Sequence, residues 1–215
     1  MIKAFPQDEE GQRALKCERT VYEKLQCSGF GSDCIVTYEE EWESGLVLER
    51  LEGTLRLHLA GLSYPPHPLL SKRWATETCQ GLTHLHDNDI LHGDIGCHNI
   101  LINAAGHVKL CDFAGSKIGE EDGWVCYEVR SQHPLHRGEQ PTIETELFAL
   151  GSALFEICTS LPPYAKESNV IVRQKYTKGE FPLVGIEDLA FQQIVEGCWR
   201  GTYNNVSEVS IALER

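Results

Sequence analysis

Apolar residues recur along the chain in patterns that predict its elements. Over 8–26 they return about every 3.6 residues, which predicts a helix. Short apolar runs at 2–5 and 46–48 are typical of strands, and a further strand is predicted at 35–38. The acidic run at 39–41 is predicted to be a solvated turn. The N-terminal part is therefore expected to form a small sheet with one helix.

Beyond Gly53 the pattern becomes mainly helical. Gly53 and the proline cluster at 64–66 bracket a short helical piece, and a long amphipathic helix is predicted over roughly 69–87. Three short extended pieces follow, at 90–91, 100–102 and 108–110. The last two are expected to pair as a hairpin across the turn at 103–106.

The segment 113–141 is polar and aperiodic, which is typical of a functional loop or a disordered stretch. A strongly apolar helix is predicted around 147–157, another over 188–199, and a short one at the end of the chain. Strands with one helix, followed mainly by helices, predict an α+β fold with two unequal lobes that meet near 49–53.

Composition narrows the possible partners. The 19 Lys and Arg residues against 32 Asp and Glu give a net charge of −13, which disfavours nucleic acid as a partner. No apolar run approaches the roughly 20 residues that a membrane span needs, so no membrane role is expected. The nine cysteines have no CxxC spacing and no secretory leader precedes them, which favours reduced thiols in the cytoplasm or nucleus.

The candidate chemistry lies between residues 90 and 115. Asp94 and Asn99 fall on a tight loop between extended segments, and Asp112 ends the strand that pairs back on the segment after Asn99. The hairpin should therefore bring two carboxylates and an amide oxygen together. Such hard oxygen ligands suit Mg²⁺ that is also held by phosphates, and a carboxylate not bound to metal can accept a proton from a hydroxyl.

This segment resembles the protein kinase superfamily. His92–Asn99 matches the H-x-D-x-x-x-x-N catalytic loop, and Asp112-Phe113, 18 residues after Asp94, matches the start of D-F-G. The resemblance implies one kinase-like domain over 1–215, with a truncated N-lobe of a small sheet and one helix over 1–51 and a mainly helical C-lobe over 52–215.

The resemblance also implies cofactors and roles. ATP and Mg²⁺ are expected, with Asp94 as the base or hydroxyl orienter and Asn99 and Asp112 as the Mg²⁺ ligands. Lys3 falls where the strand lysine clamps phosphates, and Glu18 where the helix glutamate positions it.

Two more segments of the chain resemble kinase elements. The run 48–51 is similar to the hinge that binds adenine, which makes Glu49 and Leu51 candidate nucleotide contacts. The run 146–151 resembles the start of the central C-lobe helix, with Glu146 where Asp is usual.

Several positions depart from the family pattern. No Gly-rich loop precedes Lys3, so we expect either that this sequence begins late, or that the protein binds nucleotide poorly, or that it does not catalyse. Gly93 stands in place of the Arg that pairs with a phosphorylated loop, Gly96 in place of the catalytic-loop Lys, and Ala114 in place of the Gly of D-F-G. Lys117 is a candidate to replace the missing lysine.

The leading hypothesis is an ATP- and Mg²⁺-dependent protein kinase, directed to serine or threonine. One alternative is a pseudokinase, a binding or scaffolding module with weak or no nucleotide binding, which the departures favour. A second is phosphotransfer of an atypical kind, to a small molecule or as in the kinases of the KEOPS complex, which also carry a His-Gly-Asp form.

Overall fold

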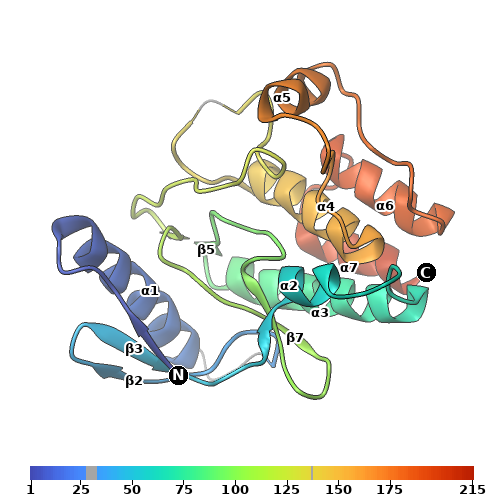
Figure 1. Ribbon diagram of the computed structural model, residues 1–215. Helices are drawn as coiled ribbons and strands as arrows, with labels where there is room; N and C mark the ends of the chain where they lie inside the picture. Colours follow the sequence, from blue (N-terminus) through green and yellow to red (C-terminus); the bar gives the residue numbers. More distant parts are fainter. Residues whose placement is uncertain (28–32, 137) are drawn as a thin grey trace.

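The computed structural model describes residues 1–27, 33–136 and 138–215 of the chain. Figure 1 shows a small sheet with one long helix on one side and a group of helices on the other, joined by extended segments. This arrangement is the predicted α+β fold, with a small N-terminal part and a larger helical part. The boundary at residue 51 stays a prediction.

The N-terminal part is a three-stranded antiparallel sheet with one helix. Its strands are β1 (Ile2–Ala4), β2 (Tyr38–Trp42) and β3 (Gly45–Leu48), in the order β1-β3-β2. The helix α1 (Glu9–Cys27) begins where the Asp8 side chain accepts a hydrogen bond from the Gly11 amide at 2.8 Å. It buries an apolar face that includes Leu15, Val21, Tyr22 and Leu25.

Two predictions for this sheet were wrong in detail. The acidic residues 39–41 lie inside β2, and the turn follows them, where Glu43 has a φ of 51°. β2 is the edge strand and residues 39–42 are all exposed, so it lacks the apolar alternation by which strands are recognised. The segment 35–37 is not a strand, although Ile35 makes an isolated bridge to Leu110.

A second small sheet carries the middle of the chain. β4 (Gly53–Thr54), β6 (Ile100–Ile102) and β7 (Val108–Leu110) are ordered β4-β6-β7, and the predicted hairpin of the last two is confirmed. Two-residue strands β5 (Ile90–Leu91) and β8 (Lys117–Ile118) pair with each other. The Leu110 amide and carbonyl bond to Cys34 and Val36, which joins the two parts of the molecule.

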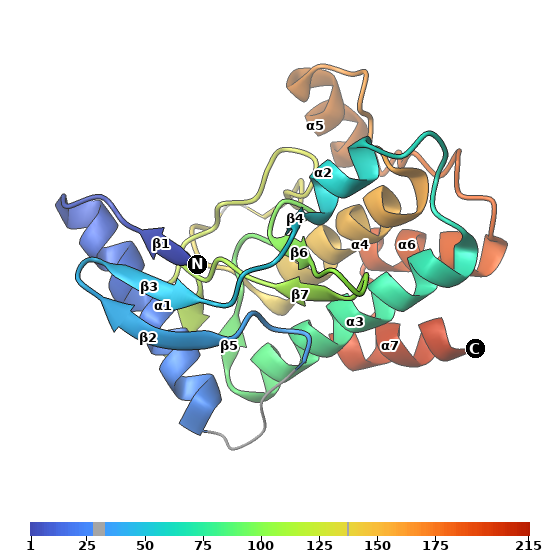
Figure 2. The same cartoon turned by 60° about the horizontal axis from the view of Figure 1, so that its bottom comes forward.

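The remaining helices form the larger part. They are α2 (Leu55–Ala60), α3 (Pro68–Asp87), α4 (Ile143–Thr159), α5 (Asn169–Thr177), α6 (Leu189–Trp199) and α7 (Val206–Glu214). α4 is buried along most of its length and packs between α3 and α6 (Figure 2). α5 was not predicted, because it buries only Val172 and Tyr176 and so lacks a clear apolar stripe.

Two further predictions concern the thiols and the membrane. Cys79, Cys97 and Cys198 are buried as expected, whereas Cys27 and Cys126 are exposed. Within the described residues, every helix is too short or too polar to cross a lipid bilayer.

Candidate active site

Lys3 joins three elements at the centre of the candidate site. Its Nζ lies 2.5 Å from Glu18 Oε2, on α1, and 2.7 Å from Asp112 Oδ1, just after β7. Burial alone would lower the pKa of Lys3, but Glu18 and Asp112 outweigh it and raise that pKa. Burial likewise acts to raise the pKa of Asp112, yet Lys3 lowers it overall, so Asp112 is a carboxylate. Burial prevails only at Glu18, whose pKa rises to about 7.

A column of four aromatic rings holds these elements in register. Tyr38 of β2 stacks on Tyr22 of α1 with ring centroids 5.5 Å apart. Tyr22 meets the edge of Phe113 at 5.2 Å, and Phe113 meets His92 at 5.2 Å. The ring of Phe113 is fully buried, so its neighbour Asp112 is held on the side of Lys3.

Asp94 and Asn99 form the second half of the site. The Asn99 Nδ2 group donates to the Asp94 carbonyl at 2.9 Å and to Asp94 Oδ2 at 3.0 Å. The Cys111 amide donates to the Asn99 carbonyl at 3.0 Å, which extends the β6–β7 hairpin and sets Asp112 beside Asn99. Asp94 and Asn99 are therefore in contact, and the residue before Asp112 is bonded to Asn99, whereas the predicted meeting of all three side chains stays a prediction. Asp112 takes a φ of 67°, a left-handed conformation that few non-glycine residues adopt.

The residues present fit a bound Mg²⁺. Asp112 is a carboxylate whose side chain is 43% exposed, and its bond to Lys3 uses only Oδ1. Both side-chain bonds of Asn99 use Nδ2, so its amide oxygen is the atom that remains for a cation. The buried Oδ1 of Asp94 also has no hydrogen-bond partner among the described residues. Such oxygen donors are the ligands that Mg²⁺ prefers.

Glu146, at the start of α4, anchors the loop that carries Asp94. Its side chain is fully buried and accepts from the amides of His92 and Gly93 at 3.0 and 2.9 Å. Tyr127 Oη donates to it at 2.7 Å, and His86 Nε2 lies 3.1 Å away. Burial acts to raise the pKa of Glu146, but His86, together with His92 and the Gly93 amide, lowers that pKa overall. The sequence marked Glu146 only as the start of a helix, and its acidic character inside an apolar run was the available signal.

The backbone conformation at position 93 favours glycine. Gly93 has a φ of 81°, and a Cβ there would lie 3.0 Å from the carbonyl oxygens of Gly115 and Trp124. A side chain at this position would therefore be strained and crowded. Lys117 lies in β8, and its ammonium contacts no carboxylate among the residues that the structure describes.

The predicted hinge residues lie between the two parts. Glu49 donates its amide to the Thr37 carbonyl at 2.9 Å, and its Oε1 accepts from Lys109 Nζ at 2.6 Å. Leu51 is half-buried against the core. A nucleotide role for Glu49 and Leu51 stays a prediction.

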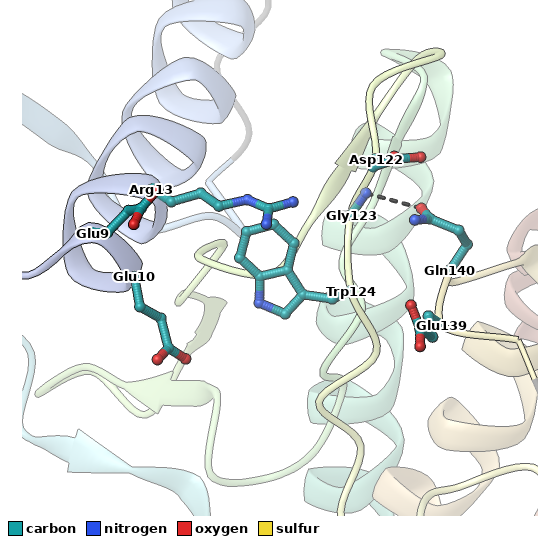
Figure 3. A pocket seen from close by; sticks show the side chains of 8 residues that line it. All are labelled: Glu9, Glu10, Arg13, Asp122, Gly123, Trp124, Glu139 and Gln140. Carbon is teal, nitrogen blue, oxygen red and sulfur yellow. Dashed lines mark hydrogen bonds between the residues drawn. The ribbon is translucent and has the colours of Figure 1, made fainter.

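The loop over 113–141 is fastened at two points near its middle, Trp124 and Glu128. Figure 3 shows Arg13 of α1 lying across the indole of Trp124, with the guanidinium carbon 3.9 Å from the ring centroid, beside an open hollow lined mainly by carboxylates. Farther along, Glu128 accepts two hydrogen bonds from Arg56 at 2.8 and 2.9 Å. Arg56 also binds the buried Glu156 through two bonds, at 2.7 and 2.9 Å. The sequence did not single out Arg56 or Glu128.

The fold and this site define a protein kinase-like domain. The chain belongs to the protein kinase domain family, which matches residues 1–200. This agrees with the resemblance of the catalytic-loop segment.

Similar proteins are protein kinases by name, and several are named serine/threonine kinases. The chain is 31% identical over 143 residues to the serine/threonine-protein kinase PrkC of Bacillus subtilis, covering 64% of this chain and 22% of that protein. It is 28% identical over 177 residues to the serine/threonine-protein kinase pkpA of Phycomyces blakesleeanus, covering 76% and 29%. A mitogen-activated protein kinase kinase kinase 1a of Physcomitrium patens is 33% identical over 118 residues, covering 53% and 16%. The matches thus span less than a third of these relatives.

Proposed function

We propose that this chain is an ATP- and Mg²⁺-dependent protein kinase that transfers phosphate to serine or threonine hydroxyls. The observation that carries the proposal is the convergence of Lys3, Glu18 and Asp112 beside the bonded pair of Asp94 and Asn99. Phosphoryl transfer depends mainly on positioning and charge stabilisation, and these groups supply both. The negative charge of the chain supports a protein acceptor rather than nucleic acid or a membrane, and the reduced thiols support a cytoplasmic or nuclear site of action.

Each group has a distinct role in this proposal. Asp94 orients the acceptor hydroxyl and takes its proton. Lys3, positioned by Glu18, holds the phosphates of the nucleotide, whose adenine lies against Glu49 and Leu51. Asn99 and Asp112 would hold Mg²⁺, which supplies charge neutralisation at the transferred phosphoryl group.

A pseudokinase role is the alternative that one observation favours. Lys3 already occupies Oδ1 of Asp112 at 2.7 Å, so the carboxylate proposed for metal is engaged by a cation of the chain itself. If that pair is too stable to open, nucleotide and Mg²⁺ cannot displace it, and the domain serves as a binding module.

Substitution of Asp112 tests the proposed role directly. Asp112→Asn removes the charge that holds Mg²⁺ while keeping the shape, and we expect phosphate transfer to a generic substrate such as casein to fall by at least ~100-fold. The fold should remain intact. Asp87→Asn, at the exposed C-terminal end of α3, is the matched control and should transfer at the wild-type rate. Full activity in Asp112→Asn would rule out the assigned role.

Thermal unfolding separates the kinase from the pseudokinase in the same samples. ATP with Mg²⁺ at 100 times its dissociation constant should stabilise a nucleotide-binding chain by about 2.7 kcal/mol. The absence of both phosphate transfer and a thermal shift at millimolar ATP would favour the binding module.

A further inference from the structure

The ring of His98 fills the space above Gly96. A Cβ built on Gly96 would lie 2.6 Å from His98 Cε1 and 2.7 Å from His98 Nδ1, closer than any real Cβ contact. The two residues are therefore coupled: the imidazole can lie where it does only because residue 96 has no side chain. Gly96 is also one of the positions at which the chain departs from the family pattern.

From that place His98 reaches the carboxylate of Asp94. His98 Nε2 lies 3.3 Å from Asp94 Oδ2, the oxygen that also accepts from Asn99 Nδ2 at 3.0 Å. The side chains of Asp94 and His98 are only 23% and 26% exposed, so the contact is largely shielded from water. Two donors from one loop thus fix one oxygen of the carboxylate.

The other side of the ring faces Glu128. Its Oε2 lies 3.7 Å from His98 Nδ1, too far for a direct hydrogen bond but near enough to orient the ring by charge. Glu128 is itself held by two bonds from Arg56. The position of His98 is therefore supported from both the catalytic loop and the loop over 113–141.

We propose that His98 is a positioning residue that holds the Asp94 carboxylate in its working orientation, in the space that Gly96 leaves open. The inference rests on the proposed kinase function for its effect on rate, and on geometry alone for the contact. A group that receives a hydroxyl proton must be held within a fraction of an ångström, because small misplacements slow reactions severely. Gly96, which stands where the family usually has lysine, therefore makes room for the His98 ring.

Kinetics of single and double variants test this role. His98→Ala removes the donor, and Gly96→Ala displaces the ring by its Cβ; each should lower kcat roughly 10-fold while the KM for ATP changes less than about twofold. His98→Gln, which keeps a donor near the same place, should recover most of the rate. The double variant Gly96→Ala/His98→Ala should be no slower than either single variant, because both remove one interaction.

A matched glycine substitution controls for the backbone. Gly61, at the end of α2, has a right-handed conformation, and a Cβ there would meet its nearest neighbour at an ordinary 3.4 Å. Gly61→Ala should leave kcat unchanged. A fall of roughly 100-fold in the Gly96/His98 double variant, or an unchanged kcat in His98→Ala, would overturn the positioning role.

A readout that needs no activity separates this inference from the proposed function. To donate to Asp94, Nε2 must carry a proton, which nitrogen-15 NMR of labelled histidine detects. We expect the signal of a protonated Nε2 in the wild-type chain. His98→Ala should lose this signal, which assigns it to His98, and Gly96→Ala should shift it. An inactive chain with this signal pattern overturns the kinase proposal and supports the contact. An active chain whose His98 Nε2 lacks the proton overturns the contact, even where Gly96→Ala fails to fold.

Discussion

Glu146 combines complete burial with a full negative charge. A buried carboxylate is costly unless donors surround it, and here two amides, a phenol and an imidazole do so. The first two donors belong to the loop that carries Asp94. Glu146, at the start of α4, thereby fixes the backbone of the loop that carries the Asp94 carboxylate.

Glu146→Gln should therefore destabilise the protein markedly. The amide nitrogen of Gln would face at least one N–H or O–H donor, and the charge that strengthens the remaining bonds would be lost. We expect the free energy of unfolding to fall by about 2–4 kcal/mol, measured by denaturant titration. Glu144→Gln, in the same first turn but 68% exposed, should change it by less than about 1 kcal/mol. Equal effects of the two substitutions would contradict this role of Glu146.

Motif spacing and the family resemblance predicted Asp94, Asn99, Asp112, Lys3 and Glu18, and the structure joins Lys3 to Glu18 and Asp112, and Asp94 to Asn99. Spacing is informative at Asn99 and Asp112 because the β6–β7 hairpin of fixed register bonds Cys111 to Asn99. Motif spacing does not identify His98, Arg56 or Glu146 as functional residues. The partners of Arg56 and Glu146 lie far away along the chain, and only the packed structure shows that these side chains meet. His98 contacts Asp94 within the same loop, but spacing does not reveal which way its ring turns.

Among the elements, those with strong periodicity were predicted and those without it were missed. α1, α3, α4 and α6 bury continuous apolar faces, whereas the edge strand β2 is acidic and α5 buries two side chains. Edge strands are stabilised by backbone pairing, which side-chain pattern does not reveal. The loop over 113–141 gave no periodic signal, yet its residues Trp124 and Glu128 contact α1 and α2.

The hydroxyl side chains of this loop are poorly accessible to phosphorylation. Its three hydroxyl residues, Ser116, Tyr127 and Ser131, are all buried. The fixed charge of Glu128 instead binds Arg56 of α2 through two bonds, as a phosphate would bind an arginine.

Glu128→Gln should loosen this loop without unfolding the domain. Because Glu128 is 45% exposed, the pair contributes about 1 kcal/mol, which corresponds to roughly fivefold more frequent local opening. Limited trypsin digestion after Lys117 or Arg130 should accelerate by that factor. Glu120→Gln, exposed in the same loop, should leave the cleavage rate unchanged. An unchanged rate in Glu128→Gln would show that other contacts hold the loop.

At the scale of the molecule, the catalytic loop and the loop over 113–141 are both held by the helical part. α4 carries Glu146 at one end and Glu156 near the other, so it fixes the catalytic loop and, through Arg56, the loop over 113–141. The order of the two lobes was predicted from the pattern of strands with one helix followed mainly by helices. The close packing of α4 on α6 was not, since it depends on one glycine, Gly151, inside a helix that the sequence marks only as apolar.

Gly151→Val should separate α4 from α6 and weaken the whole molecule. A Cβ at Gly151 would lie 2.8 Å from Cys198 Cβ and 3.2 Å from Trp199 Cδ1, and both neighbours are buried parts of α6 that cannot swing aside. The bond from Trp199 Nε1 to Ser152 Oγ, 2.9 Å long, would be strained as well. We expect a loss of about 2–4 kcal/mol in unfolding free energy, and a lower melting temperature by calorimetry. Gly53→Val is the control, because a Cβ there meets nothing within 4 Å. If both variants melt alike, the α4–α6 contact does not set the stability of the fold.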